Sequence, residues 1–252
     1  AAAAALRTLV ERLPLTQVGP LGAVCVGAAG TVGGTGAGWI RAELQPLCAG
    51  PVVVVEDVAL PLAAAGLDEG VGLICGTGSA GWGCYAGRSA RAGGWGYLLG
   101  DEGGGYWLVR RALQTVLDRR DRGTDLGALA ADLARAAGAA DARDVWRRLY
   151  EDPRPGPWAR LAPAVLSSAD PAVEAILSEA GVALAHLAEV VLDRLSAPDD
   201  LPVVLAGGVL EHPRAKAAAS MALERIWPAR PLVFPTEPPV AGAARLARRA
   251  LG

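Results

Sequence analysis

The stretch "GGWGYLLGDEGGGYW", residues 93–107, determines how the rest of the chain is interpreted. It places two adjacent acids, Asp101 and Glu102, among seven glycines, with a tryptophan on either side. Glycine inside a helix or strand costs roughly 0.5–1 kcal/mol relative to alanine, so this concentration needs a geometric reason. Half of the chain's twelve aromatic residues fall between Trp82 and Trp107. Indole faces pack against sugar or nucleobase rings, and a carboxylate accepts hydrogen bonds from two hydroxyls, so the stretch predicts a site for such a ligand.

Two simpler interpretations of the same stretch stay open at the sequence level. Trp95, Tyr97 and Trp107 are alternatively core residues, and we expect that for one or two of them. One of the two acids alternatively caps the helix predicted to follow, because an acid near a helix N-terminus contributes about 0.3–1 kcal/mol.

Composition excludes several classes of protein. The 252 residues carry a net charge of -2 and no basic stripe, so we expect no nucleic-acid partner. We also expect no membrane partner, because no apolar run approaches the roughly 20 residues that span a bilayer. The opening "AAAAALRTLVERL" predicts an amphipathic helix and not a signal peptide. Four cysteines without CxxC spacing predict reduced thiols and a cytoplasmic protein. The apolar positions of the opening helix are Leu6, Leu9, Val10 and Leu13.

Strands alternate with helices along the chain, which predicts an α/β fold. Short apolar runs predict strands at 22–30, 51–57, 70–79, 80–87, 201–209 and 230–235. Residues 105–195 are predicted to be largely helical, with Asp170 and Pro171 starting a long helix. "GTVGGTGAG" at 30–38 and "DPRPGP" at 152–157 are predicted loops.

Three further segments carry candidate site chemistry. "PVVVVED" delivers Glu56 and Asp57 at the carboxyl end of a strand, where α/β sheets bind ligands, so Asp57 is a candidate base. It is alternatively a solvated acid or a helix cap. "CGTGS" offers backbone N–H groups and two hydroxyls for a phosphate, or is a plain hairpin turn. "VVLAGGV" lets a flat ring approach the backbone. No GxxxxGK[ST] occurs, so a P-loop NTPase is excluded.

Taken in order, these segments resemble the BadF/BadG/BcrA/BcrD-type ATPase family and, within it, the N-acetylglucosamine kinases. The similarity runs from about Ala23 to the last helix. Its most specific part is the pairing of "CGTGS" with the glycine-rich stretch at 93–107. The resemblance implies an α/β fold with two RNase H-like lobes of the actin-like ATPase type and an interlobe cleft. It implies an N-terminal lobe at 1–68, a C-terminal lobe at 69–239, and a closing helix at 240–252 that returns to the first lobe.

The resemblance also implies roles for individual residues. Asp57 looks like the base that takes the proton from the sugar hydroxyl being phosphorylated. The sugar-binding set is Gly94, Trp95, Asp101 and Glu102. The phosphate loop is Gly76, Thr77, Gly78 and Ser79, and the adenosine motif is Ala206, Gly207 and Gly208. ATP and Mg²⁺ are the implied cofactors, with no protein-built metal cluster.

One departure from the family concerns its first phosphate loop. Nothing similar to the "DGGGT" motif occurs before Gly27, so the resemblance implies a first lobe truncated at its N-terminus. A kinase with one of two phosphate loops would be weakened, because donors aimed at the transferred phosphoryl group do most of the catalysis.

Three functions remain in competition. The leading hypothesis is ATP-dependent phosphorylation of N-acetylglucosamine to its 6-phosphate, with glucosamine as the nearest rival substrate and a homodimer possible. The second is a catalytically inactive sugar-binding or regulatory module. The third, an activator ATPase of 2-hydroxyacyl-CoA dehydratases, is disfavoured because Cys75 has no suitably placed second cysteine to hold an iron–sulfur cluster. His186 is predicted to be structural, and His212 to lie in a surface loop or face the nucleotide.

Overall fold

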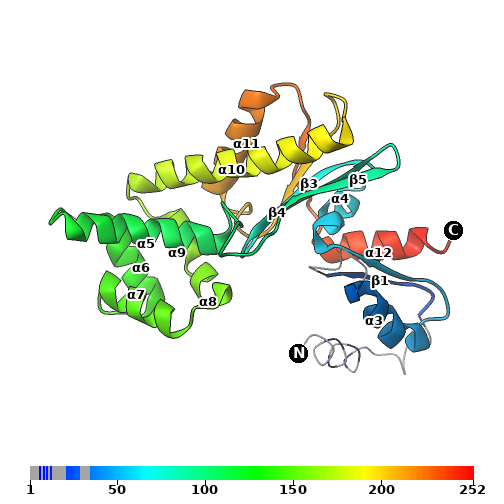
Figure 1. Ribbon diagram of the computed structural model, residues 1–252, viewed down its shortest axis with the longest axis horizontal. Helices are drawn as coiled ribbons and strands as arrows, with labels where there is room; N and C mark the ends of the chain where they lie inside the picture. Colours follow the sequence, from blue (N-terminus) through cyan, green and yellow to red (C-terminus); the bar gives the residue numbers. More distant parts are fainter. Residues whose placement is uncertain (1–5, 7, 9, 11, 13–20, 29–34) are drawn as a thin grey trace. The chain divides into compact units, whose positions relative to one another are not determined.

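The computed structural model describes residues 6, 8, 10, 12, 21–28 and 35–252, which fold as two compact units. Unit 1 comprises residues 1–68 and 235–252, and unit 2 comprises residues 69–234. The chain is therefore a mixed α/β protein in which the C-terminal segment belongs to the same unit as the N-terminal one (Figure 1).

Unit 1 is built on two parallel strands joined by a helical crossover, as parallel pairing requires. β1 and β2 pair with Val24 opposite Val52, and Ile40 and Leu44 of the crossover helix are buried in the adjacent apolar cluster. Leu6 and Val10 of the opening segment also pack against this cluster, whereas Leu9 and Leu13 lie outside the described residues. The elements are β1 (Val24–Gly27), α3 (Thr35–Leu44), η1 (Gln45–Leu47), β2 (Val52–Val55), η2 (Asp57–Ala59), α4 (Leu60–Ala64) and α12 (Pro239–Arg249).

The last helix, α12, completes unit 1 by packing on α4 and β1. The two helices come close because Gly242 has no side chain where a Cβ would lie 2.2 Å from the Leu60 carbonyl oxygen. Arg245 of α12 donates to the Ala63 carbonyl at 3.1 Å and to that of Ala64, which satisfies carbonyl groups at the end of α4. The C-terminal helix is thus held to α4 of unit 1 by contacts with the backbone of that helix.

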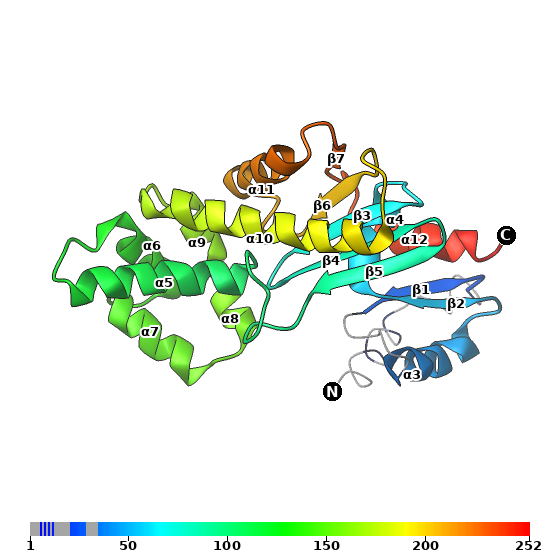
Figure 2. The same ribbon diagram turned by 45° about the horizontal axis from the view of Figure 1, so that its top comes forward.

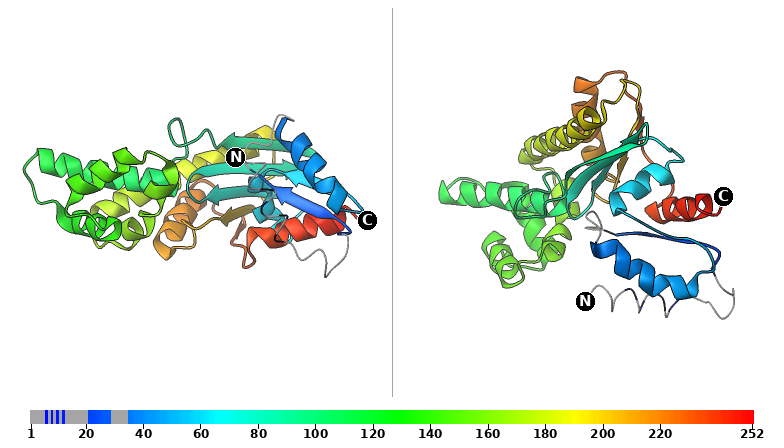
Figure 3. Two further views of the ribbon diagram at one scale, coloured as in Figure 1. Left: turned by 90° about the horizontal axis from the view of Figure 1, so that it is seen from below. Right: turned by 45° about the vertical axis from the view of Figure 1, so that its right-hand side comes forward.

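Unit 2 contains a five-stranded sheet in the order β5-β4-β3-β6-β7. β3, β4 and β5 form an antiparallel meander, and β6 and β7 extend the sheet in parallel on the other side of β3. Figure 3 shows these strands from two sides. Their bounds are β3 (Gly70–Cys75), β4 (Ser79–Tyr85), β5 (Arg88–Gly93), β6 (Val203–Ala206) and β7 (Leu232–Val233).

The long helix α10 (Ala172–Leu195) lies along one face of this sheet, against β3, β4 and β5, and α11 (Pro213–Ile226) packs beside it (Figure 2). By length and composition α10 is apolar enough to cross a membrane. The expectation that no segment is long and apolar enough to span a bilayer was therefore wrong. Half of its most apolar window is buried in unit 2, as is usual for a core helix.

A group of five helices follows the meander and gathers beyond the end of the sheet in unit 2 (Figures 1 and 2). Their apolar faces join the core of the sheet, with Leu108, Val109 and Val145 fully buried. The prediction of a largely helical 105–195 is confirmed. The helices are α5 (Gly105–Asp121), α6 (Gly127–Ala137), α7 (Ala142–Glu151), α8 (Pro155–Ala159) and α9 (Ala162–Ser167).

Local signals misled the prediction in three places. Strand β5, "RSARAG", was missed because it has no β-branched or aromatic residue, and its ladder with β4 holds it in place. The predicted loop at 152–157 contains the start of α8, since proline is tolerated in a first helical turn. The predicted loop at 30–38 becomes helical from Thr35, while residues 30–34 lie outside the described part.

The Asp170 carboxylate accepts hydrogen bonds from three helical elements of unit 2. Helix α10 begins at Ala172, whose N–H donates to Asp170 Oδ1 at 3.0 Å. The carboxylate, almost fully buried, also receives a two-pronged contact from Arg119 at 2.7 and 3.0 Å and the N–H of Leu129 at 3.3 Å. The hydrogen bond from Arg119 is the main reason that its pKa is lowered to about 2. One side chain therefore joins α5, α6 and α10.

We expect Asp170→Ala to destabilise unit 2 by about 3–5 kcal/mol, because it leaves Arg119 without its buried partner. Asp118→Ala is the matched control: it breaks an exposed pair between α5 and Arg122, the residue that follows this helix, and is expected to leave the unfolding midpoint nearly unchanged. Urea unfolding followed by circular dichroism measures both. The native Asp170 carboxyl has a depressed pKa, so its stabilisation is present above pH 4 and is lost between about pH 4 and 2. Equal losses in the two variants would contradict this assignment.

Candidate functional site

The centre of the candidate site is the tight turn that joins β3 to β4. Gly76 donates to the Gly78 carbonyl at 2.9 Å and closes the turn. The carbonyls of Gly76 and Thr77 accept the N–H groups of Gly105 and Tyr106, at 2.8 and 3.0 Å, so they point toward the start of α5. Within the described residues the N–H groups of Thr77 and Gly78 have no acceptor, and Thr77 is exposed. Outward N–H groups of this kind form an anion-binding concavity.

Asp101 lies directly against this turn. A Cβ on Gly78 would be 2.2 Å from Asp101 Oδ2, so the carboxylate occupies the space that the missing side chain leaves. Burial is the main cause of its raised pKa, while backbone hydrogen bonds from Ser79 and Gly96 lower it. Asp101 adopts φ +64, a left-handed conformation. Such a backbone state costs of order 1–3 kcal/mol and is typical of functional sites.

The glycine-rich segment is fastened to the β3–β4 turn by side chains as well. Ser79 Oγ donates to the Glu102 carbonyl at 2.7 Å, and the buried Cys75 thiol donates to the Gly103 carbonyl at 3.1 Å. Burial raises the pKa of Cys75 to about 12. A neutral, enclosed thiol is poorly suited to hold an iron–sulfur cluster, which disfavours the activator-ATPase alternative further.

The aromatic residues of the glycine-rich stretch at 93–107 lie partly in the core and partly on the surface. Trp107 is buried and Tyr97 packs against the core, as the simpler interpretation expected for one or two of them. Trp95, by contrast, is 76% exposed. Helix α5 begins after Gly104 with no side-chain cap, so capping does not explain Asp101 or Glu102. The indole of Trp95 and the carboxylate of Asp101 therefore remain available for a ligand.

The second glycine turn follows β6 and lies beside the first. Gly207 adopts φ +108, and a Cβ there would be 2.4 Å from the Cys75 carbonyl oxygen, so only glycine fits. Val209 donates to the same carbonyl at 3.1 Å, and Gly208 is exposed next to it. The expected adenosine motif and the expected phosphate turn are thus adjacent in unit 2. Ala206 ends β6 opposite Ile74.

A pocket of about 480 Å³ opens between these two turns and the α8–α9 segment. Gly76, Thr77 and Gly208 line one side, and Arg160 brings a positive charge from the other. Its volume lies in the range of small-molecule sites, roughly 300–1,000 Å³. Sequence reasoning missed Arg160 because it stands in no recognisable motif. The one sequence feature that could have indicated Arg160 is its position, as a positively charged residue next to a proline- and glycine-rich segment.

The remaining predicted residues lie elsewhere. Asp57 belongs to unit 1, directly after β2, where the N–H of Val58 donates to its Oδ1 at 3.0 Å, and Glu56 beside it is buried. His212 is the N-cap of α11, and its Nδ1 accepts from the Arg214 N–H at 3.3 Å. His186 is exposed beside Glu189. No group of three potential metal-ligating side chains occurs in the described part of the chain.

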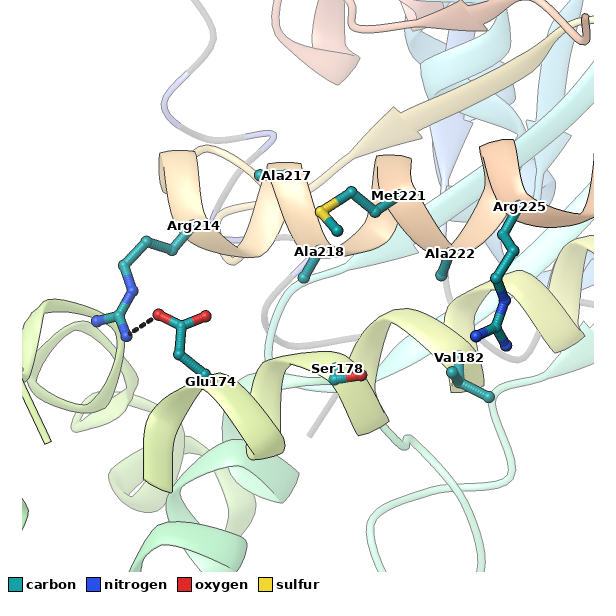
Figure 4. Close-up of a pocket in the computed structure, with 9 residues that line it drawn as sticks. All are labelled: Glu174, Ser178, Val182, Arg214, Ala217, Ala218, Met221, Ala222 and Arg225. Atoms are coloured by element: carbon teal, nitrogen blue, oxygen red, sulfur yellow. Dashed lines mark hydrogen bonds and ion pairs between the residues drawn. The ribbon is translucent and has the colours of Figure 1, made fainter. Parts of the chain in front are cut away.

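A separate groove between α10 and α11 contains none of the predicted site residues. Figure 4 shows Glu174 and Arg214 paired at one end and Arg225 at the other, with Met221 and Val182 beside a floor of small side chains. Its volume is about 290 Å³. Because it lacks convergent polar groups along its length, it is not the candidate site.

The chain is similar to known proteins in sequence and in fold. A model of the BadF/BadG/BcrA/BcrD ATPase family matches residues 20–247. The chain is 34% identical over 131 residues to an N-acetylmuramic acid/N-acetylglucosamine kinase of Clostridium acetobutylicum, covering 46% of this chain and 42% of that protein. It is 34% identical over 164 residues to an N-acetyl-D-glucosamine kinase of Dictyostelium discoideum, and this match covers 62% of this chain and 51% of that protein. The chain therefore spans about half the length of the curated relatives it matches.

A crystal structure from Chromobacterium violaceum, of a protein provisionally described as an N-acetylglucosamine kinase, resembles most of the chain. The TM-score is 0.67 at 29% identity, and the match covers 94% of this chain and 80% of that one.

We expect Gly104→Ala to destabilise unit 2 by roughly 1–3 kcal/mol, because its Cβ would lie 2.6 Å from Gly78 Cα and force two backbones apart. Gly76→Ala, in the β3–β4 turn on the other side of this contact, meets nothing within 4 Å and serves as the matched control, with a change within about 0.5 kcal/mol. Urea midpoints compare the two. If both variants unfold at the wild-type midpoint, the close approach of the turn to α5 is not a structural requirement.

Proposed function

The chain belongs to the BadF/BadG/BcrA/BcrD ATPase family, and from this premise we propose that it transfers the terminal phosphoryl group of Mg-ATP to an amino sugar, N-acetylglucosamine first of all. The family match confirms the resemblance drawn from the sequence. The contact between Asp101 and Gly78 carries the proposal, because it makes the carboxylate for the sugar and the turn for the phosphates neighbours in one unit.

The pocket beside the β3–β4 turn suits a nucleotide triphosphate. The free N–H groups of Thr77 and Gly78 would donate to phosphate oxygens, and the Arg160 guanidinium would balance their charge. The exposed backbone at Gly207 and Gly208 would pass along the purine and ribose. In phosphoryl transfer the protein contributes chiefly positioning and electrostatic stabilisation, which is the chemistry these groups offer.

Mg²⁺ would reach the site with the nucleotide. It keeps several waters and is usually held by one or two carboxylates together with substrate phosphates.

The sugar would bind between Trp95 and Asp101. The exposed indole offers a flat apolar face. The Asp101 carboxylate is fixed by its left-handed backbone and by the N–H groups of Ser79 and Gly96. It would accept hydrogen bonds from two sugar hydroxyls. Gly94 and Glu102 would complete this side. Holding the acceptor hydroxyl in line provides part of the roughly 7–11 kcal/mol that orientation can contribute.

Asp57 is the proposed general base. It follows strand β2 at its carboxyl end, with one oxygen held by the Val58 N–H. It would take the proton from the sugar hydroxyl as that oxygen attacks the terminal phosphorus, and the nucleoside diphosphate would leave. Glucosamine is the rival acceptor, and a sugar-binding module without turnover is the rival function.

We expect Asp57→Asn to lower kcat about 10²–10⁴-fold with little change in sugar affinity, because it removes the base and keeps the shape. Asp101→Asn should chiefly weaken sugar binding. A coupled ADP-release assay with Mg-ATP and N-acetylglucosamine, glucosamine or glucose measures turnover. Asp68→Asn, an exposed acid of unit 1 paired with Arg249, is the matched control.

Calorimetry separates the competing functions. Sugar binding that depends on Asp101, combined with no turnover on any sugar, would replace the kinase with the binding module. The absence of both sugar binding and nucleotide binding would refute the proposed site itself.

A further inference from the structure

Unit 2 contains a second cavity of about 330 Å³ that shares no residue with the pocket beside the β3–β4 turn. It lies between α5, α7, α8 and the turn that carries Tyr97 and Leu98. Apart from Arg110 and Gln114, its lining is aromatic or apolar. The aromatic members are Tyr97, Tyr106, Trp146, Tyr150 and Trp158.

The aromatic walls are arranged as two groups. Tyr97 packs edge-on against Tyr106 with ring centroids 4.9 Å apart, and Tyr106 packs against Trp158 at 5.2 Å. Trp158 Nε1 donates to the Leu149 carbonyl at 3.1 Å, which fixes this group in place. Trp146 and Tyr150 form the second group at 5.1 Å, and Tyr150 is 67% exposed. A rigid wall faces a solvent-accessible one, with edges and faces that suit another aromatic ring.

Arg110 is the one charged residue of the cavity. Its Nε–H is buried and has no hydrogen-bond partner among the residues that the structure describes. The neighbouring Arg111 is fully engaged with Glu179 at 2.9 and 3.0 Å. Leaving a buried donor without an acceptor is unfavourable, so a ligand whose acceptor reaches the Arg110 guanidinium is favoured.

The polar groups of the cavity are few. The lining brings the Arg110 guanidinium and the phenol groups of Tyr97, Tyr106 and Tyr150 to one cavity with otherwise mostly apolar walls. Guanidinium binds carboxylate through two parallel hydrogen bonds. A free sugar, with hydroxyls on every side, would leave most of them unsatisfied against the leucine and proline side chains here.

We propose that this cavity binds a small aromatic carboxylate, with the carboxylate on Arg110 and the ring between the Tyr106 and Tyr150 sides. The site is independent of the kinase activity proposed above, because it uses neither the nucleotide pocket nor the sugar-binding residues. Phenolic probes are appropriate, since the tyrosine hydroxyls can also accept or donate to a ring substituent.

Isothermal titration of the 252-residue chain with 4-hydroxybenzoate tests this proposal. The neutral 4-hydroxybenzamide is the matched ligand, and we expect it to bind at least ten-fold more weakly. Arg110→Gln should weaken 4-hydroxybenzoate binding at least ten-fold. Arg120→Gln, an exposed arginine of α5 outside the cavity, should leave the affinity unchanged. Asp101→Asn should also leave it unchanged, which separates this site from the proposed sugar site.

Tyr150→Ala provides a second route to the same answer if Arg110→Gln fails to fold, because Tyr150 is largely exposed and its loss should be tolerated. We expect it to weaken 4-hydroxybenzoate binding several-fold. No binding of 4-hydroxybenzoate, equal binding of the amide, or affinity unaffected by either variant would overturn the proposal. A dimer that covers Trp146 and excludes the probe would overturn it as well.

Discussion

The candidate site depends on the backbone contact between the β3–β4 turn and the start of α5. Two carbonyls of the turn, at Gly76 and Thr77, take the first N–H groups of the helix, and Gly104 lies against Gly78 at a distance that no side chain permits. The sheet is thereby joined to the helical group. Because the carbonyls face the helix, the N–H groups of the same turn face outward, which is the orientation that phosphate binding requires.

This contact also determines which groups are left for an anion. A helix N-terminus is usually an anion site, but the first N–H groups of α5 are already used by the turn. The positive potential must therefore come from the turn itself and from Arg160, which α8 brings to the same pocket. Asp101 fills the space beside Gly78, so a carboxylate lies directly against the same turn. In the proposed function, a hydroxyl held by Asp101 would be kept close to the phosphates.

The sequence was informative where a residue's role is set by its immediate neighbours. The β3–β4 hairpin follows from "GVGLICGTGS", and the free thiols follow from the cysteine spacing. Strand β5 could not be predicted, because pairing with β4 and not its own composition makes it a strand. Arg160 and Arg110 could not be predicted as site residues either. Each lines its cavity together with residues that are distant in the sequence. Nor does any local pattern reveal that Asp170 accepts from three elements of unit 2.

The turn at 96–100 stands next to both proposed sites of unit 2. It is closed by the N–H groups of Leu99 and Gly100, which both donate to the Gly96 carbonyl. Tyr97 lines the aromatic cavity, whereas Trp95 precedes the turn and Asp101 follows it. The proposed sugar site and the proposed aromatic-carboxylate site are therefore adjacent along the chain. Each is fixed by a contact of its own, because the Tyr97 ring packs on Tyr106 and the Asp101 carboxylate lies against Gly78. The two sites are thus close in sequence and separate in the contacts that hold them.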